Sequence, residues 1–336
     1  MADRETSIVS FLTKNGWAGA TRRTLADDAS FRRYERLRDA DRTAILMDAP
    51  PAKEDVRPFL AIDGVLRELE LSAPKVYAQD LKTGLLLLED LGDDTYTRVL
   101  SERPEQEEML YNLAVDTLIA LHRRFDGGPG TPRYDDARLL AETDLLLDWY
   151  LPAVTGAAVA KADRREFSDL WRRAFARTRA VPDTLVLRDY HVDNLMWLPK
   201  RAKVEACGLL DFQDAVIGPV TYDLVSLLED ARRDVPPDLA SRAIQRYLDA
   251  FPEVDPNAFR TSYAILGAQR STKILGVFTR LDRRDGKPDY LVHVPRVWRW
   301  LEADLTHPAL EGVCGWFDRM LPSDLRRLPE RTIPRR

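Results

Sequence analysis

The chain has 336 residues, and its 50 lysine and arginine residues against 55 aspartate and glutamate residues give a formal net charge of −5. Hydrophobic residues make up 45% and charged residues 31%, a globular composition, and the length suggests about two domains or lobes. The mild acidity argues against nucleic-acid binding, and the longest aliphatic run, Leu85–Leu88, is far too short to cross a membrane.

Short strands dominate the first ninety residues. Alternating apolar residues and a polar turn at 38–41 predict a hairpin that ends before Pro50 and Pro51, because proline lacks the N–H that a sheet needs. The predicted elements are strands over residues 31–37, 43–48, 74–77 and 84–89, with one helix over 56–71. This order is typical of a small β-rich lobe.

Helices dominate the rest of the chain, beginning at about residue 105. One group of strands interrupts them, over residues 185–187, 195–198 and 203–210, and the chain is predicted to return to helix after Asp211. The pattern predicts an α+β protein of two lobes. We place the boundary near Asp90–Asp93, which gives lobes over residues 1–90 and 91–336.

The N-terminus and the cysteines bear on the cellular location. The first residues, Met1–Glu5, lack the apolar segment of a secretory signal. Cys207 and Cys314 are too few for a disulfide framework or a structural zinc site. We therefore expect a soluble, cytoplasmic protein with no membrane or nucleic-acid partner.

The hairpin over residues 195–210 carries polar residues at its open end. Asn194 precedes the first strand and Asp211 follows the second, so strand pairing brings the two side chains together. A carboxylate and an amide oxygen are suitable ligands for Mg²⁺, which keeps several of its waters. Asp189 lies on the same loop, where it is able to orient a substrate hydroxyl and accept its proton. This D-x-x-x-x-N, hairpin, D-F order is typical of phosphoryl transfer.

Each of these residues alone is more often a turn or a helix cap, and only the combination favours a catalytic site. The segments that carry the pattern are Leu187–Asn194, Leu210–Ala215, Gly218-Pro219 and Tyr222–Leu224. With these segments the chain resembles the aminoglycoside phosphotransferase and choline kinase superfamily. Four further segments, 28–34, 46–51, 87–93 and 293–298, resemble its subfamily of anomeric N-acetylmuramate/N-acetylglucosamine kinases of bacterial cell-wall recycling.

The resemblance implies a bilobal protein-kinase-like fold, with a nucleotide-binding lobe over residues 1–90 and a catalytic and acceptor-binding lobe over 91–336. It also implies ATP and Mg²⁺ as cofactors. The implied roles are catalysis for Asp189, metal binding for Asn194 and Asp211, support of the catalytic loop for Asp223, and adenine binding by the hinge backbone at Glu89, Asp90 and Leu91. Asp223 is open to a second interpretation, an N-cap for a helix beginning near Leu224.

Two features depart from the superfamily pattern. The loop begins with Leu187-Arg188-Asp189 instead of His-Gly-Asp, and the strand over 43–48 has Met47 where a phosphate-binding lysine is expected. No glycine-rich loop precedes that strand. We expect the turn at 28–30, with the Ser30 hydroxyl, and either Arg32 or Arg33 to bind the phosphates instead. Strand alternation allows only one of the two arginines to reach the cleft.

The resemblance implies a kinase that uses ATP and Mg²⁺ to phosphorylate the anomeric hydroxyl of an amino sugar, N-acetylmuramate and/or N-acetylglucosamine. Arg270 and Lys273 lie three residues apart on one helix face, where they are candidates for acceptor binding or else belong to a solvated surface. Two alternatives stay open. One is a kinase for an aminoglycoside or choline-like acceptor, and the other is a catalytically silent nucleotide-binding pseudokinase.

Overall fold

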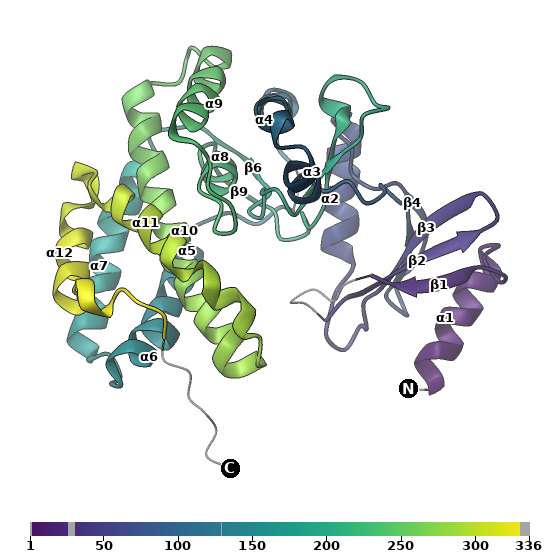
Figure 1. Cartoon of the computed structure of the whole chain (residues 1–336), viewed down its shortest axis with the longest axis horizontal. Helices are drawn as coiled ribbons and strands as arrows, with labels where there is room; N and C mark the ends of the chain where they lie inside the picture. Colours follow the sequence, from purple (N-terminus) through teal and green to yellow (C-terminus); the bar gives the residue numbers. More distant parts are fainter. Residues whose placement is uncertain (1, 26–30, 129, 330–336) are drawn as a thin grey trace. The chain divides into compact units, whose positions relative to one another are not determined.

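The computed structural model describes residues 2–25, 31–128 and 130–329. Contacts divide the chain into two compact units, Met1–Arg124 with Val192–Asp214 and Phe125–His191 with Ala215–Arg336 (Figure 1). The first unit therefore extends beyond residue 90, because it includes the helices over 96–124, which contact the hairpin over 195–209.

A five-stranded sheet forms the frame of the first unit, in the order β1-β2-β3-β5-β4 with antiparallel neighbours. The elements of this unit are α1 (Ala2–Lys14), β1 (Thr21–Thr24), β2 (Arg33–Asp39), β3 (Arg42–Asp48), α2 (Arg57–Glu68), β4 (Val76–Asp80), β5 (Leu85–Leu88), α3 (Tyr96–Glu102), η1 (Pro104–Gln106), α4 (Glu107–Arg124), β7 (Leu195–Trp197), η3 (Lys203–Ala206) and β8 (Cys207–Leu209). The predicted hairpin, helix and two following strands are confirmed as β2, β3, α2, β4 and β5.

Helix α1 was not expected from the sequence, and it covers one face of the sheet (Figure 1). Its apolar residues Ile8, Phe11 and Leu12 lie one helical turn apart and pack against Leu37 and Leu46 of the sheet. Alternation in β3 directs Ala44 and Leu46 toward this core and leaves Ile45 and Met47 facing the opposite side.

The hairpin of β7 and β8 is shorter than expected. Leu195 pairs with Leu209 and Trp197 with Cys207, whereas residues 203–206 form a 3-10 helix instead of the start of a strand. Ser72, which follows α2, bridges to Gly208, and the hairpin thereby joins the sheet unit. A Cβ at Gly208 would lie 2.9 Å from the Met196 Cβ atom, so this close packing requires glycine.

The second unit is mostly helical. Its elements are α5 (Asp136–Leu145), a π-helical turn η2 (Leu146–Tyr150), α6 (Leu151–Thr155), α7 (Lys161–Thr178), β6 (Asp183–Val186), β9 (Val216–Pro219), α8 (Tyr222–Leu228), α9 (Pro237–Ala250), α10 (Pro256–Asp285), η4 (Pro288–His293), α11 (Val294–Leu305), η5 (Pro308–Leu310), α12 (Glu311–Met320) and η6 (Ser323–Leu325). None of the helices in the described part of the chain is long and apolar enough to cross a membrane.

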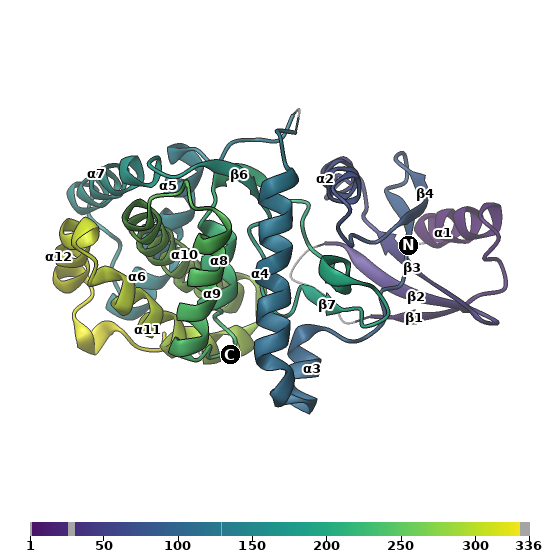
Figure 2. The same cartoon turned by 90° about the horizontal axis from the view of Figure 1, so that it is seen from above.

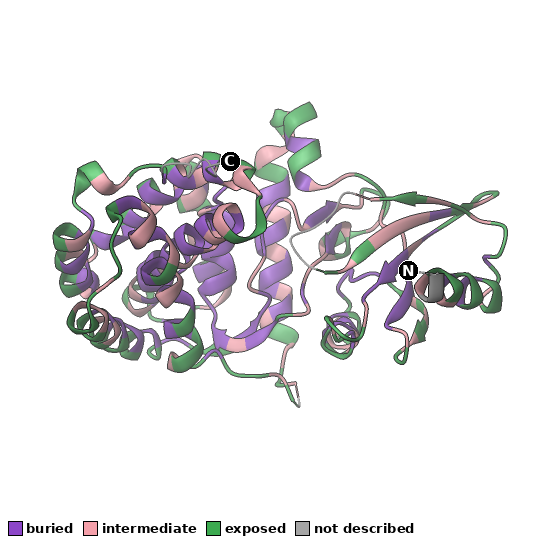
Figure 3. Ribbon diagram, turned by 90° about the horizontal axis from the view of Figure 1, so that it is seen from below, coloured by how far each residue is buried: buried purple, intermediate pink, exposed green. Residues whose placement is uncertain are grey.

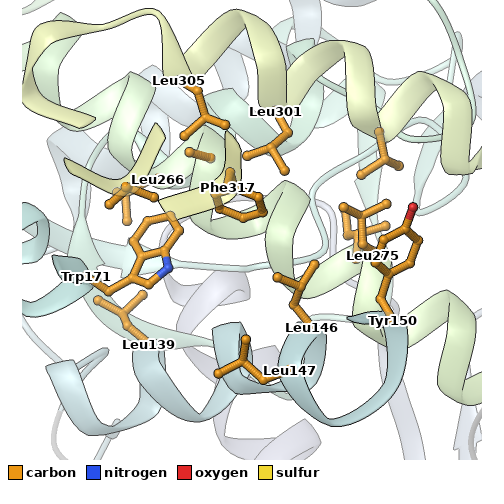
Figure 4. Close-up of a cluster of buried hydrophobic side chains, with 14 of the residues drawn as sticks. Leu139, Leu146, Leu147, Tyr150, Trp171, Leu266, Leu275, Leu301, Leu305 and Phe317 are labelled. Carbon is orange, nitrogen blue, oxygen red and sulfur yellow. The ribbon is translucent and has the colours of Figure 1, made fainter. Parts of the chain in front are cut away.

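Helix α10 lies at the centre of this unit and contacts α5, α7, α8 and α11 (Figure 2). Gly276 allows its close approach to α5, because a Cβ there would overlap with the backbone of Leu145. Buried positions lie on the inner sides of the helices (Figure 3). Figure 4 shows Trp171, Leu266, Leu301 and Phe317 in the resulting apolar core.

Strand β9 corrects the prediction that the chain returns to helix directly after Asp211. Residues 216–219 pair with β6, and helix begins only at Tyr222. The four-residue segment is too short to show a strand period in the sequence, and its conformation is fixed by its partner strand. This two-stranded sheet positions Leu187 and the loop that follows β6.

Candidate active site

A cavity of about 410 Å³ lies in the first unit. Apolar side chains line it from the sheet and from the hairpin, among them Ile45, Leu88, Met196 and Leu210. The residues that the sequence assigns to the hinge, Glu89, Asp90 and Leu91, also line it. A mostly apolar cavity with a backbone segment along one side suits a planar heteroaromatic base.

Arg36 also lines this cavity, and the sequence analysis did not identify it. Its guanidinium forms two contacts with Asp90, Nε to Oδ2 at 2.9 Å and Nη2 to Oδ1 at 3.0 Å. It also donates to the Gly92 carbonyl and to the Asp93 carboxylate. Strand alternation could have identified Arg36 from the sequence, because Arg36 lies on the same side of the extended chain as Arg32 and Tyr34.

Asn194 and Asp211 both border this cavity. The backbone N–H of Leu210 donates to the Asn194 carbonyl at 3.0 Å, which places the two ends of the hairpin side by side. Asp211 has φ +57°, an uncommon conformation for a residue with a Cβ, and its Oδ1 accepts a hydrogen bond from Gln213. The following residue, Phe212, stacks on Phe59 of α2 with ring centroids 5.0 Å apart.

These two residues fit a magnesium ion. Asn194 and Asp211 supply an amide oxygen and a carboxylate beside an open cavity, which is a donor set that Mg²⁺ completes with water and phosphate oxygens. Among the described residues, no group of three or more histidine, cysteine or acidic side chains is arranged to hold a metal.

Arg32 and Arg33 differ as strand alternation predicts. Arg32 is largely buried and its Nη2 lies 3.4 Å from the Asp211 Oδ1, whereas Arg33 is exposed. Met47 is buried between the neighbouring strands, opposite Tyr34 and Leu86, so no lysine occupies that position. Ser30, the other candidate for phosphate binding, lies outside the described residues.

The second unit holds Asp189, Asp223, Arg270 and Lys273. The Asp223 carboxylate accepts hydrogen bonds from the backbone N–H groups of Leu187 at 2.6 Å and Arg188 at 2.8 Å. Burial raises the pKa of Asp223 to about 7, although these hydrogen bonds and Arg270 act in the opposite direction. Helix α8 has Thr221 at its N-cap position, so the alternative interpretation of Asp223 as the N-cap is wrong.

Arg270 is buried on α10 and Lys273 is half-buried, with its side chain 14% exposed, so the alternative of a solvated surface is wrong. Arg270 donates to the Arg188 carbonyl at 3.1 Å, and its Nη1 lies 3.8 Å from the Asp189 Oδ1. The Lys273 ammonium pairs with the buried Glu142, a residue that the sequence analysis did not identify. Burial alone would raise the pKa of Asp189, but the charges of Lys273 and Arg270 lower it to about 2.

The structure thus groups the candidate residues in two sets. Asn194, Asp211, Arg32 and the hinge belong to the first unit, and Asp189, Asp223, Arg270 and Lys273 belong to the second. The loop over residues 187–194 passes from the second unit to the first. A single segment of chain therefore carries both the candidate catalytic aspartate and a candidate metal ligand.

Comparison with known proteins identifies the family. The model of the phosphotransferase enzyme family matches residues 21–256. The N-acetylmuramate/N-acetylglucosamine kinase of Caulobacter vibrioides is 38% identical, over 97% of this chain and 99% of that protein. The enzyme of the same name from Pseudomonas aeruginosa is also 38% identical, over 82% of this chain and 81% of its own length.

Solved structures support the fold. The crystal structure of a choline kinase from Streptococcus pneumoniae has a TM-score of 0.65 and 14% identity, covering 90% of this chain and 99% of that one. This likeness confirms the expected α+β kinase-like fold, with a β-rich N-terminal region and a mostly helical remainder. On the match to its family model and the similarity to these kinases, the chain belongs to the phosphotransferase enzyme family.

Proposed function

We propose that this protein uses ATP to phosphorylate the anomeric hydroxyl of N-acetylmuramate and/or N-acetylglucosamine, forming the sugar 1-phosphate. The observation that carries the proposal is the 38% identity to the Caulobacter kinase over nearly the full length of both chains. The reaction belongs to the recycling of cell-wall sugars. It needs ATP, and we therefore place the enzyme in the cytoplasm.

The cavity of the first unit is the proposed nucleotide site. Its apolar lining suits adenine, and the hinge backbone at Glu89, Asp90 and Leu91 offers the hydrogen bonds that the base needs. Arg32 is the proposed replacement for the missing lysine, because it is the largely buried cation beside Asp211. Arg33 is exposed and has no such role. Ser30 stays a candidate for phosphate binding on sequence grounds.

Asn194 and Asp211 are the proposed holders of Mg²⁺. When bound, the ion would neutralise charge on the transferring phosphoryl group. The fixed conformation of Asp211, with its hydrogen bond from Gln213, orients the carboxylate before the ion arrives. Arg32 adds a second positive charge that does not depend on metal binding.

Asp189 is the proposed catalytic residue, and its electrostatics favour an orienting role. A carboxylate with a pKa of about 2 is a weak base at neutral pH, so it binds the acceptor hydroxyl by a hydrogen bond and holds it in line for attack. Asp223 helps to hold Asp189 in place, because its carboxylate accepts two hydrogen bonds from the backbone that directly precedes Asp189.

The alternatives receive less support. The side chains around Asp189 include the cations Arg270 and Lys273, which would repel a cationic aminoglycoside or choline-like acceptor. A silent pseudokinase was suggested by Met47, but Arg32 supplies the missing charge and Asp189, Asn194 and Asp211 are all present. Both observations favour an active kinase for a neutral or acidic sugar.

One assay tests the proposal directly. ATP consumption is measured with a panel of amino sugars, choline and aminoglycosides, and phosphorus NMR of the product locates the new phosphate. We expect turnover with N-acetylmuramate or N-acetylglucosamine and a product phosphorylated at the anomeric carbon. Turnover with choline or an aminoglycoside alone, or phosphorylation of another hydroxyl, would refute the proposed reaction.

A further inference from the structure

Glu142 lies beside the loop of Asp189, and one of its carboxylate oxygens accepts hydrogen bonds from both Arg188 and Lys273. We infer that Arg188 and Lys273, anchored together by Glu142, recognise a carboxylate on the acceptor and thereby select an acidic amino sugar over its neutral counterpart. This inference rests on the proposed function, because it assigns specificity to the same reaction. Glu142, Arg188 and Lys273 all belong to the second unit.

The backbone of Arg188 has an unusual conformation. Its φ of +72° lies in the left-handed region, which glycine adopts freely and residues with a Cβ adopt only at a cost. The chain holds this conformation from both sides, since the Arg188 N–H donates to Asp223 and its carbonyl accepts from Arg270. An arginine at a position that suits glycine indicates that its side chain has a use.

The side chain of Arg188 is directed at Glu142, which is nearly fully buried. The Glu142 Oε1 accepts from both Arg188 and Lys273, the latter at 3.2 Å, while Oε2 accepts from Tyr134 and, at 2.9 Å, from Gln269. Burial would raise the pKa of Glu142, but Lys273 and Arg188 lower it to about 2. Glu142 is therefore a fixed negative anchor for two cations.

Arg188 and Lys273 share a single oxygen of Glu142. Lys273 has three donor hydrogens, and Glu142 is the hydrogen-bond partner that the structure describes for it. Lys273 also acts on Asp189, as the strongest of the charges that lower the pKa of that carboxylate. Arg188 directly precedes Asp189 in the chain and shares the Glu142 oxygen with Lys273, so the remaining donor capacity of Lys273 lies beside the loop that carries the group proposed to hold the acceptor hydroxyl.

This arrangement suits an acceptor with a negative charge near its reacting hydroxyl. N-acetylmuramate carries a lactyl carboxylate, whereas N-acetylglucosamine carries a neutral hydroxyl at the same ring position. A charge-assisted hydrogen bond from Lys273 is available only to the first sugar. The pair thereby sets the preference between the two substrates.

The test compares the two sugars with matched variants of α10. In Lys273→Gln we expect kcat/KM for N-acetylmuramate to fall roughly 10- to 150-fold, the loss of one charge-assisted bond, and the ratio of the two sugars' kcat/KM to fall with it. Lys273→Arg keeps the charge and should largely restore the ratio. Arg284→Gln removes a cation from the exposed end of the same helix and should leave the ratio unchanged.

Arg188→Gly provides a second, independent variant. Glycine suits the backbone conformation, so the fold should persist, as circular dichroism and thermal melting will check. We expect the same shift in preference toward the neutral sugar as in Lys273→Gln. If either variant lowers kcat/KM for both sugars by the same factor, the specificity role is wrong while the proposed function stands. If the unaltered enzyme phosphorylates neither sugar, the proposed function fails and the specificity role fails with it.

Discussion

Arg36 forms a two-contact ion pair with Asp90, the middle residue of the hinge. Both side chains are nearly buried, at 10% and 7% exposed, and the pair borders the candidate nucleotide cavity. The Asp90 Oδ1 also accepts from the backbone N–H of Gly92, so one carboxylate fixes both the arginine and the turn of the hinge. The hinge conformation therefore depends on a side chain from β2.

We predict that Arg36→Ala weakens ATP binding by about tenfold or more, because it leaves the buried Asp90 carboxylate unpaired. Isothermal titration with ATP measures the change. Arg33→Ala, on the opposite face of the same strand, is the control and should bind ATP normally. The double variant Arg36→Ala with Asp90→Asn should recover part of the loss. An unchanged ATP affinity in Arg36→Ala would contradict a role in positioning the hinge.

A second prediction concerns the replacement of the missing lysine. Arg32→Ala should raise KM for ATP and lower kcat, with a combined loss in kcat/KM of roughly 10- to 150-fold, as expected for a lost charge-assisted bond. Arg33→Ala should be nearly silent, because its side chain is exposed. Steady-state kinetics with varied ATP separate the two. Full activity of Arg32→Ala would mean that another group binds the phosphates.

The candidate catalytic and metal residues should respond differently to substitution. Asp189→Asn should abolish turnover, with at least about a hundredfold loss in kcat, while ATP binding in the presence of Mg²⁺ survives. Asp211→Ala should instead weaken ATP binding only when Mg²⁺ is present. Titration of both variants with ATP, with and without Mg²⁺, distinguishes these outcomes. Identical behaviour of the two variants would overturn the division of roles.

A pair of carboxyl groups, the half-buried Glu229 and the buried Asp304, predicts a pH effect on stability. A Cβ at Gly267 would overlap with the Asp304 carboxylate and lie 2.7 Å from that of Glu229, so the two groups meet across this glycine. Burial raises the pKa of Glu229 to about 7, although Asp304, Tyr263 and Arg270 act in the opposite direction, and burial together with Glu229 raises the pKa of Asp304.

Raised pKa values give the sign of the effect. Above about pH 4 the unfolded chain releases the proton of Glu229, whereas the folded protein keeps it. The contribution of Glu229 to the free energy of unfolding is therefore largest below about pH 4. It is lost as the pH rises to about 7, by at most about 1.4 kcal/mol per pH unit for one proton. Urea unfolding at several pH values measures this decline.

Glu229→Gln should flatten the decline between pH 5 and 7, because an amide donates to Asp304 without titrating. Asp238→Asn, which removes an exposed carboxylate, is the control and should keep the slope of the unaltered protein. Equal slopes in Glu229→Gln and the unaltered protein would show that the pair does not carry the pH dependence.

Local patterns in the sequence predicted four of the five strands of the first sheet, all but β1, and the pairing that brings Asn194 and Asp211 together. The hairpin of β2 and β3 and helix α2 follow from apolar periods and from Pro50 and Pro51, which act over a few residues. The adjacency of Asn194 and Asp211 follows from the pairing of two short strands. Each of these inferences needs only neighbours in the chain and the geometry of one hairpin.

Only the tertiary structure decided which polar side chains meet across long stretches of chain. Glu142 is 46 residues from Arg188 and 131 from Lys273, and Arg36 is 54 from Asp90. Helix α1 and strand β9 likewise depend on the faces that they cover or extend. Hydrophobic periodicity predicts which face of a helix or strand is apolar. A buried ion pair forms only where packing brings its two residues together, and a local sequence pattern does not predict which residues those are.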